Sequence, residues 1–426
     1  RFFSAFNRGF DRAKSGYLAG CATLISRSGL SVVGLAAAVA AVVLLGIKIP
    51  SSFLPQEDQG YLYVNVQLPV AASLQRSDEI CAQVEEILKN QAGVQSYNTI
   101  VGFSLLSSVM TTYNGFFFVT LEPWGDRDPE GLTADVVMAQ LNYKMRELPG
   151  AVVFPFPPPA IPGVGSSGGI TFMLEDLQSR GMEFLGKQMD DFMKAAEARP
   201  EIGRVATTAE LAVPQVFADV KRDMVLTQGV SLSGVYETLQ TYMGGYFINY
   251  FNRFGRVWQV YIEAEGEFRN NVEKLDRFYV QNSSGGMVPL GAIVETKSTY
   301  GPEFTMRFNQ HNAVQLMVAP APGFSGGQVM QALEETFASS MPSGMGYNYE
   351  GMAFQAKEAA SGVSPSVIFG FPLLMVFLIL AAQYESWSLP FSVLLTTPIA
   401  IMGAFLALWV RDFSNDLYTQ IGLVML

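Results

Sequence analysis

The sequence predicts an α+β membrane protein, in which transmembrane helices accompany a large extracytoplasmic region of two split βαβ (ferredoxin-like) units, the second carrying an inserted mixed α/β domain. Three observations support this fold class. Apolar residues make up 49% of the chain and charged residues 15%, a balance that is unusual for a soluble globule. Long uncharged apolar runs lie near both ends. Between them, strand and helix patterns recur in the order β-α-β-β-α-β.

The apolar runs predict transmembrane helices, each of which needs about 20 apolar residues. We expect spans at 29–49, 365–383 and 389–410, and the start of a truncated span at 417–426. Pro372 and Pro398 lie inside spans, where neighbouring helices can absorb a kink. Because the chain begins with Arg1 and ends within the apolar run IGLVML, we interpret it as a piece of a longer polypeptide.

The orientation of the first span follows from the charges before it. Residues 1–28 carry five basic side chains and one acidic side chain, Asp11, so this segment is expected to face the cytoplasm. The spacing of Phe6, Phe10 and Leu18 suits an amphipathic helix on the membrane surface, and it suits an ordinary cytoplasmic linker helix equally well. The region from Pro50 to about residue 365 is then extracytoplasmic.

The first βαβ unit begins with a half-buried strand. Over residues 61–68, Leu62, Val64 and Val66 alternate with polar or tyrosine side chains. Helices are expected at 74–88 and 132–148. Two strands are expected to flank the uncharged segment 102–119, one on each side, and a closing strand is expected at 151–156.

The second unit begins at Ile170 with the strand ITFML, followed by a helix at 184–196. GRVATTAE and PQVFADV are expected to pair as strands. The closing helix and strand come only after Gly326, and the intervening residues are rich in strand and turn signals. The sequence therefore predicts an insertion within this unit. His311, in RFNQHNAV, is expected at a strand end or turn.

Enzyme chemistry receives no support from the motifs. G-x-S-x-G, Walker and H-E-x-x-H patterns are absent from the sequence, and two cysteines with one histidine give no basis for redox or zinc chemistry. We predict no catalytic residue, metal or cofactor. The net charge of −11 argues against a nucleic-acid partner. Glu57 and Asp58 could bind a cation, although a capped or solvated loop is the more common outcome. Apart from Lys48 at the end of the first, the expected spans contain no Asp, Glu, Lys, Arg or His, so they show no ion relay.

Apolar material at strand ends is the strongest candidate for a binding site. The segment GFSLLSSVMTTYNGFFFV (102–119) is uncharged, and FPFPPPAIPGVGSSGG (154–169) joins two phenylalanines to a stiff proline run. With the polar-aromatic face of strand 61–67, these segments could line an apolar cleft dotted with hydrogen-bonding groups, suited to amphiphilic ligands. A subunit interface would explain the same surface equally well.

Four motifs resemble the hydrophobe/amphiphile efflux pumps of the resistance-nodulation-division superfamily, the inner-membrane components of tripartite multidrug efflux systems. They are IPSSFLPQEDQGYLYVNVQLP, GRVWQVYI, MVPLGAIV and AAQYESWSLPFSVLLTTPIAIMGAFLA. The resemblance covers essentially the whole chain and fits the second half of such a pump. It implies a porter subdomain at 50–169, a second at 170–230 with 323–356, and a funnel or docking subdomain at 231–322.

The resemblance also implies a function and partners. Such pumps reside in the bacterial inner membrane with most of this region in the periplasm, work as homotrimers, and export drugs, detergents and dyes in exchange for protons. A periplasmic adaptor and an outer-membrane channel are the implied protein partners. The family's proton relay needs two carboxylates from the first half of the pump and a lysine beyond Leu426, so this fragment alone is not expected to transport.

Site residues carry over by position. Segment 102–115 matches the family's mobile loop between two binding pockets, with Gly102 and Gly115 as hinges, although it is longer than in the enteric type and lacks its basic residue. Asn98 and Ala206 stand where some members have an aromatic residue and an arginine. The implied substrate-binding residues are Tyr63, Asn65, Gln67, Asn98, Phe103, Leu105, Phe116, Phe118, Phe154, Phe156 and Pro158.

Two other functions fit parts of the sequence. A non-transporting, membrane-anchored scaffold or translocation accessory would use the same fold without a drug pathway. Metal efflux would need Met, Glu or His ligands converging on the cleft, which a single histidine and scattered methionines disfavour.

Overall fold

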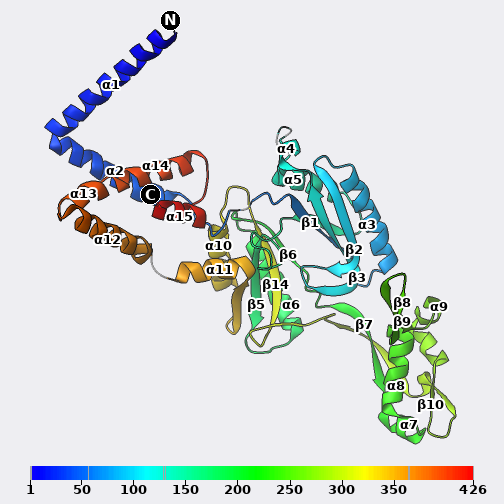
Figure 1. Ribbon diagram of the computed structural model, residues 1–426. Helices are drawn as coiled ribbons and strands as arrows, with labels where there is room; N and C mark the ends of the chain where they lie inside the picture. The colour runs from blue at the N-terminus through cyan, green and yellow to red at the C-terminus, as the bar shows by residue number, and fades with distance from the viewer. Residues whose placement is uncertain (1, 56, 128, 130, 363–364, 426) are drawn as a thin grey trace. The chain divides into compact units, whose positions relative to one another are not determined.

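The structure is a computed structural model that describes residues 2–55, 57–127, 129, 131–362 and 365–425. By its internal contacts the chain divides into two compact units (Figure 1). The first comprises Arg1–Ala209 with Thr305–Leu426, and the second is Glu210–Phe304. The insertion was expected at 231–322, so the second unit begins and ends earlier in the chain than the sequence predicts.

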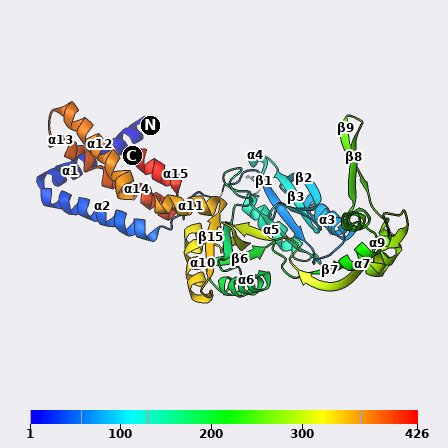
Figure 2. The same cartoon turned by 90° about the horizontal axis from the view of Figure 1, so that it is seen from below.

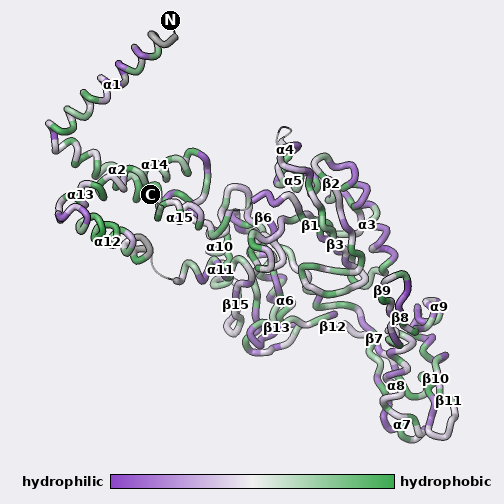
Figure 3. Tube along the Cα trace, in the orientation of Figure 1, coloured by the Kyte–Doolittle hydropathy of each residue, from purple (hydrophilic) through white to green (hydrophobic). Residues whose placement is uncertain are grey.

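Helices form both ends of the first unit. They are α1 (Phe2–Ser26), α2 (Ser28–Lys48), α12 (Pro365–Tyr384), α13 (Leu389–Leu394), α14 (Thr397–Val410) and α15 (Leu417–Met425). In Figure 3, α2, α12 and α14 are largely hydrophobic whereas α1 is mixed. α2 and the stretch Leu389–Val410 are long and apolar enough to cross a membrane, whereas the apolar part of α12 that the structure describes fully, Gly370–Tyr384, is shorter. Leu44 and Val410 are each 68% exposed, as lipid contact requires. Leu426, the last residue of the expected truncated span, lies outside the described residues.

The chain leaving α2 is tied to the link between α14 and α15. The Lys48 ammonium lies 5.0 Å from the centre of the Trp409 ring, where a cation is attracted by the aromatic face. Two residues further on, the Asn415 amide donates a hydrogen bond of 2.9 Å to the Pro50 carbonyl. These contacts fix where the chain passes from the apolar helices into the first sheet.

The first sheet confirms the predicted β-α-β-β-α-β order. Its strands lie in the order β2-β3-β1-β4, all antiparallel to their neighbours. Serine and threonine side chains at positions 73 and 133 cap the two helices that cover one face of the sheet. The elements are β1 (Tyr61–Gln67), α3 (Leu74–Lys89), β2 (Val94–Ser104), β3 (Val109–Leu121), α4 (Trp124–Arg127), α5 (Ala134–Met145) and β4 (Val152–Phe156).

The alternation seen in β1 separates two faces of this sheet. Leu62, Val64 and Val66 are at most 1% exposed and join the core beneath α3 and α5. Tyr63 belongs to a second cluster on the opposite face. Burying one set of alternate side chains under helices and leaving the other to a different partner is the behaviour expected of a half-buried strand.

The second sheet belongs to the first unit as well. β14 lies between β5 and two other strands, pairing along different parts of its length with β13 and β6, while β15 pairs with the far side of β5. Three helices accompany it. The elements are β5 (Ile170–Asp176), α6 (Met182–Glu197), β6 (Ile202–Thr207), β13 (Met306–Phe308), β14 (His311–Pro320), α10 (Gly326–Ser340), β15 (Met345–Glu350) and α11 (Gly351–Ser361).

The strand pairing expected for this unit is wrong in one respect. β6, within GRVATTAE, does not pair with PQVFADV; it pairs with β14. PQVFADV is β7 (Val213–Val220), which pairs with β12 (Val294–Gly301) in the second unit. The insertion therefore lies between β6 and β14, and the strand that completes the second β-α-β-β-α-β unit is β14. His311 begins β14 just after a turn at Asn309 and Gln310, as expected.

The second unit has its own small core, which includes Val225, Val235 and Leu290. Beside β7 and β12 its elements are α7 (Arg222–Thr227), α8 (Leu232–Leu239), a π-helical turn (Gln240–Gly244), β8 (Tyr246–Arg253), β9 (Arg256–Ile262), α9 (Gly266–Arg269), 3-10 turns at Val272–Arg277 and Leu290–Ala292, β10 (Tyr279–Gln281) and β11 (Met287–Pro289). Figure 2 shows β8 and β9 as a ribbon extending from the helices of this unit, and every residue of both strands is exposed.

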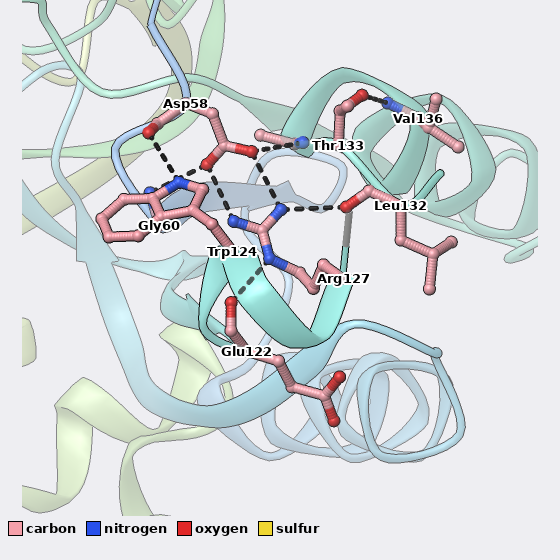
Figure 4. A network of polar contacts seen from close by, with 9 residues as sticks. Asp58, Gly60, Glu122, Trp124, Arg127, Leu132, Thr133 and Val136 are labelled. Atoms are coloured by element: carbon pink, nitrogen blue, oxygen red, sulfur yellow. Dashed lines mark hydrogen bonds and ion pairs between the residues drawn. The ribbon is translucent and has the colours of Figure 1, made fainter. Parts of the chain in front are cut away.

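A buried ion pair anchors the segment that precedes β1 (Figure 4). The Arg127 guanidinium is fully buried and donates two hydrogen bonds, of 2.9 and 3.0 Å, to the two carboxylate oxygens of Asp58. The amides of Gly60 and Ala134 donate to the same carboxylate. Burial opposes ionisation of Asp58, yet the hydrogen bonds from Arg127, Ala134 and Gly60 lower its pKa to about 2. This carboxylate is therefore occupied by the protein's own groups.

Candidate functional site

The register of the first sheet brings most of the expected site residues onto one face. One row across the four strands reads Asn98, Phe118, Tyr63 and Phe156. The next row reads Ile100, Phe116, Asn65 and Phe154. Gln67 follows on β1, opposite Asn114 and Val152. Cross-strand neighbours on one face lie about 5 Å apart at Cβ, so these side chains form a continuous surface.

The rings on this face pack against one another. The Tyr63 ring centre lies 5.3 Å from Phe116, 5.4 Å from Phe118 and 5.6 Å from Phe156. Phe116 and Phe118 meet edge to face at 4.9 Å. Such edge-to-face pairs are favourable beyond the apolar area that they bury. We call the side chains of Tyr63, Phe103, Leu105, Leu106, Phe116, Phe118, Phe154 and Phe156 the aromatic cluster.

A single amide lies among these rings without a hydrogen-bond partner. Asn65 is fully buried, and in the described part of the chain neither its side-chain oxygen nor its nitrogen is hydrogen-bonded. Leaving a buried polar group unsatisfied costs about 1–3 kcal/mol, so its presence calls for an explanation beyond packing. Tyr63 adds a hydroxyl to the same face; burial, and then the neighbouring Tyr61, raise its pKa, which keeps it neutral.

Comparison with known proteins decides the family. The model of the AcrB/AcrD/AcrF family matches this chain over residues 1–426. The chain belongs to the AcrB/AcrD/AcrF family. The resemblance read from the four motifs is thereby confirmed, and the family consists of membrane transporters of the resistance-nodulation-division type rather than enzymes.

Curated relatives in this family are efflux proteins. The chain is 34% identical to the antibiotic efflux pump membrane transporter ArpB of Pseudomonas putida, over 99% of this chain and 40% of ArpB. It is 34% identical to the multidrug export protein AcrF of Escherichia coli K12, over 99% of this chain and 41% of AcrF. The multidrug resistance protein MdtF of the same strain is 32% identical. The chain thus spans about 40% of the length of these relatives.

The long loop expected at 102–115 is mostly strand, which corrects the sequence-based prediction. β2 continues to Ser104 and β3 begins at Val109, so only four residues, 105–108, form the turn of a β-hairpin. Phe103 contacts Phe116 edge to face at 6.5 Å, and Leu105 packs on the aromatic cluster. The absence of charge in this segment suggested an apolar loop. The structure shows strands instead, whose uncharged side chains pack on the rings and so need no polar partners.

The two expected hinge glycines of this family member have different surroundings. Gly102 stands where the pairing of β2 with β3 is interrupted, and its φ of +83° lies in the region that favours glycine. Gly115 lies inside β3, paired with Val101 on one side and Val66 on the other. A Cβ at Gly115 would lie 2.6 Å from the Cys81 sulfur, so close packing accounts for this glycine.

Two contributors to the face were missed by sequence reasoning because they come from the second sheet. Met317 of β14 packs against the aromatic cluster, and the Arg204 guanidinium of β6 lies 4.2 Å from the centre of the Phe154 ring. No local signal marks either residue. Pro158, by contrast, lines a separate small crevice with Thr133 and Met138.

In this conformation the aromatic cluster fills its own space. Phe116 is fully buried and Phe156 is 9% exposed, whereas Phe118 remains 36% exposed at the edge. A ligand on this face would therefore have to displace rings from one another, and the hairpin β2–β3 carries three of them, Phe103, Phe116 and Phe118.

Proposed function

We propose that this chain is part of a proton-driven multidrug efflux transporter that exports amphiphilic compounds, and that the aromatic cluster with Asn65 is its ligand-binding face. The observation that carries the proposal is the unpartnered Asn65 amide among aromatic rings. A plain core or a permanent interface would gain stability from an apolar residue at that position, whereas a ligand that brings its own donor or acceptor pairs the amide only when bound.

The route follows from the same proposal. The compounds would come from the periplasm and the outer leaflet of the inner membrane and leave through an outer-membrane channel, with a periplasmic adaptor and a homotrimeric assembly. The names of the relatives support the class of cargo, since they refer to antibiotic efflux and multidrug export. Proton coupling would use residues of the full-length protein outside this chain, because the spans α2, α12 and α14 carry no ionisable side chain between their ends.

The test uses the full-length protein in a bacterial strain that lacks its own efflux pumps. Phe118→Ala removes the most exposed ring of the cluster and is expected to lower resistance to dyes and detergents several-fold, because an aromatic contact contributes about 0.5–1.5 kcal/mol. Growth inhibition and dye accumulation are the readouts, and a protonophore should abolish the efflux of the wild type.

Tyr143→Ala is the matched control, because Tyr143 is 71% exposed on α5, away from the aromatic cluster. It should leave resistance unchanged at equal membrane levels. If Phe118→Ala also leaves resistance unchanged, or if the wild type confers none, the drug-transport proposal fails and the membrane-anchored scaffold becomes the better account.

A further inference from the structure

Arg204 lies against the aromatic cluster, and its positive charge has no ion-pair partner among the described residues. Its guanidinium stacks on Phe154, the cross-strand neighbour of Asn65. Within the described ranges of the chain, no carboxylate lies within ion-pair distance of Arg204 and its side chain makes no hydrogen bond. A guanidinium has five N–H donors, and half-burying one without an acceptor is unfavourable unless a partner arrives from elsewhere.

A second arginine makes the spot more positive. Burial lowers the pKa of Arg204, and the nearby charge of Arg146, just after α5, lowers it further; the attraction of Glu197 only partly offsets both effects. Arg146 likewise has no ion pair among the described residues. The two arginines therefore leave a local excess of positive charge, which Glu197 only partly offsets, in a chain whose net charge is −11.

Another stacked arginine in the same unit has an acidic partner as well. The Arg180 guanidinium lies 3.8 Å from the Phe184 ring centre, but it also pairs with the Asp176 carboxylate at 3.5 Å. Arg253 and Arg411 also stack on rings without an ion pair in the described part of the chain, but both are exposed to solvent, whereas Arg204 is half-buried. The comparison directs attention to a ligand that supplies the negative charge.

We propose that Arg204, with Arg146 beside it, binds the anionic head of single-chain amphiphiles whose apolar tail lies on the aromatic cluster next to Phe154. A planar guanidinium holds a carboxylate or sulfate through two parallel hydrogen bonds, and its aromatic support keeps it in place. Phe154 is partly exposed and offers the tail an apolar surface beside that head, with the buried Phe156 ring packed next to it. The inference rests on the proposed function and adds a charge preference to it.

The binding test uses purified full-length protein in phosphatidylcholine nanodiscs, so that the bilayer supplies no anionic lipid. Radiolabelled dodecyl sulfate and dodecyltrimethylammonium, which share one tail and differ in head charge, are titrated below their critical micelle concentrations, with empty discs subtracted. Arg204→Gln is expected to weaken dodecyl sulfate binding about ten-fold or more, since a charge-assisted hydrogen bond is lost, and to leave the cationic probe unaffected. Arg204→Lys should restore part of the affinity.

Arg180→Gln is the control, because it removes an equally stacked arginine away from the aromatic cluster. The proposal would be overturned if Arg204→Gln lowered the binding affinity of both probes equally, or did not lower that of dodecyl sulfate. Arg204 would then have only a packing role against the Phe154 ring. Cell resistance to the two detergents separates this result from the wider function. A wild type that protects against neither refutes transport, while the binding data still decide the role of Arg204.

Discussion

Arg127 shows how one buried charge organises a junction in the chain. Its side chain reaches the Asp58 carboxylate and the carbonyl oxygens of Glu122 and Leu132, so it joins the segment before β1 to the segments on both sides of α4. The sequence offered Asp58 as a capped loop residue or a cation ligand, and nothing local singled out Arg127 as its partner. The two residues are 69 positions apart in the chain, so no local sequence spacing could have indicated that they pair.

We expect this pair to make the protein sensitive to acid. The folded pKa of Asp58, about 2, lies below its ordinary value of 3.8, so its stabilisation is complete above pH 4 and is lost as pH falls from about 4 through 2. The shift corresponds to about 2 kcal/mol. Asp58→Asn should remove that acid-dependent part and cost about 3 kcal/mol at pH 7, because the buried Arg127 loses a carboxylate partner. Unfolding of the full-length protein between pH 2 and 7, followed by intrinsic fluorescence, measures both effects.

A surface pair provides the comparison at the same scale. Lys221 and Glu295 lie 3.3 Å apart but are half exposed, and such pairs contribute little. Glu295→Gln should therefore change stability by less than about 1 kcal/mol. An Asp58→Asn variant that behaved like Glu295→Gln would contradict the structural role given to the buried pair.

At the scale of elements, local patterns predicted the strands and helices that have one buried face. β1 and α6 followed from periods of two and 3.6, and their positions in the structure agree. β14 failed this test because it pairs with β5, β6 and β13 and is buried on both faces over Ala313–Leu316, which removes the alternation. The hairpin β2–β3 failed for a related reason, since its uncharged face carries aromatic rings that pack on one another.

Gly115 allows the packing of an element to be tested directly. An added methyl group would meet the Cys81 sulfur of α3 at 2.6 Å, so Gly115→Ala should lower stability by about 1–3 kcal/mol. Cys81→Ala removes that sulfur, and the double variant should recover most of the loss. Gly125→Ala is the control, because an added Cβ there meets nothing within 4 Å. Apparent melting temperatures of the purified full-length protein provide the measurement; a loss that Cys81→Ala does not relieve would favour the hinge role expected for Gly115.

At the scale of the whole molecule, the sequence predicted two βαβ units and an insertion, and the structure contains them. The limits of the insertion were not predictable from local sequence. β7 and β12 have the pattern of ordinary exposed strands, and only their pairing shows that they belong together. The paired residues are at least 74 positions apart in the chain, beginning with Val220 and Val294. The aromatic cluster shows the same limit. Its rows on β1 and β3 follow from alternation, but Arg204 and Met317 reach it from another sheet.

The orientation of the chain in the membrane remains a prediction that a labelling experiment can decide. The five basic residues in 1–28 predict that α1 lies in the cytoplasm, and α2 would then carry both sheets to the other side. In full-length protein with Cys21→Ser and Cys81→Ala, a cysteine at the exposed Lys187 of α6 should react with a membrane-impermeant maleimide in intact spheroplasts. A cysteine at the exposed Lys14 of α1 should react only after permeabilisation. The reverse pattern would refute the proposed topology and, with it, the placing of the aromatic cluster in the periplasm.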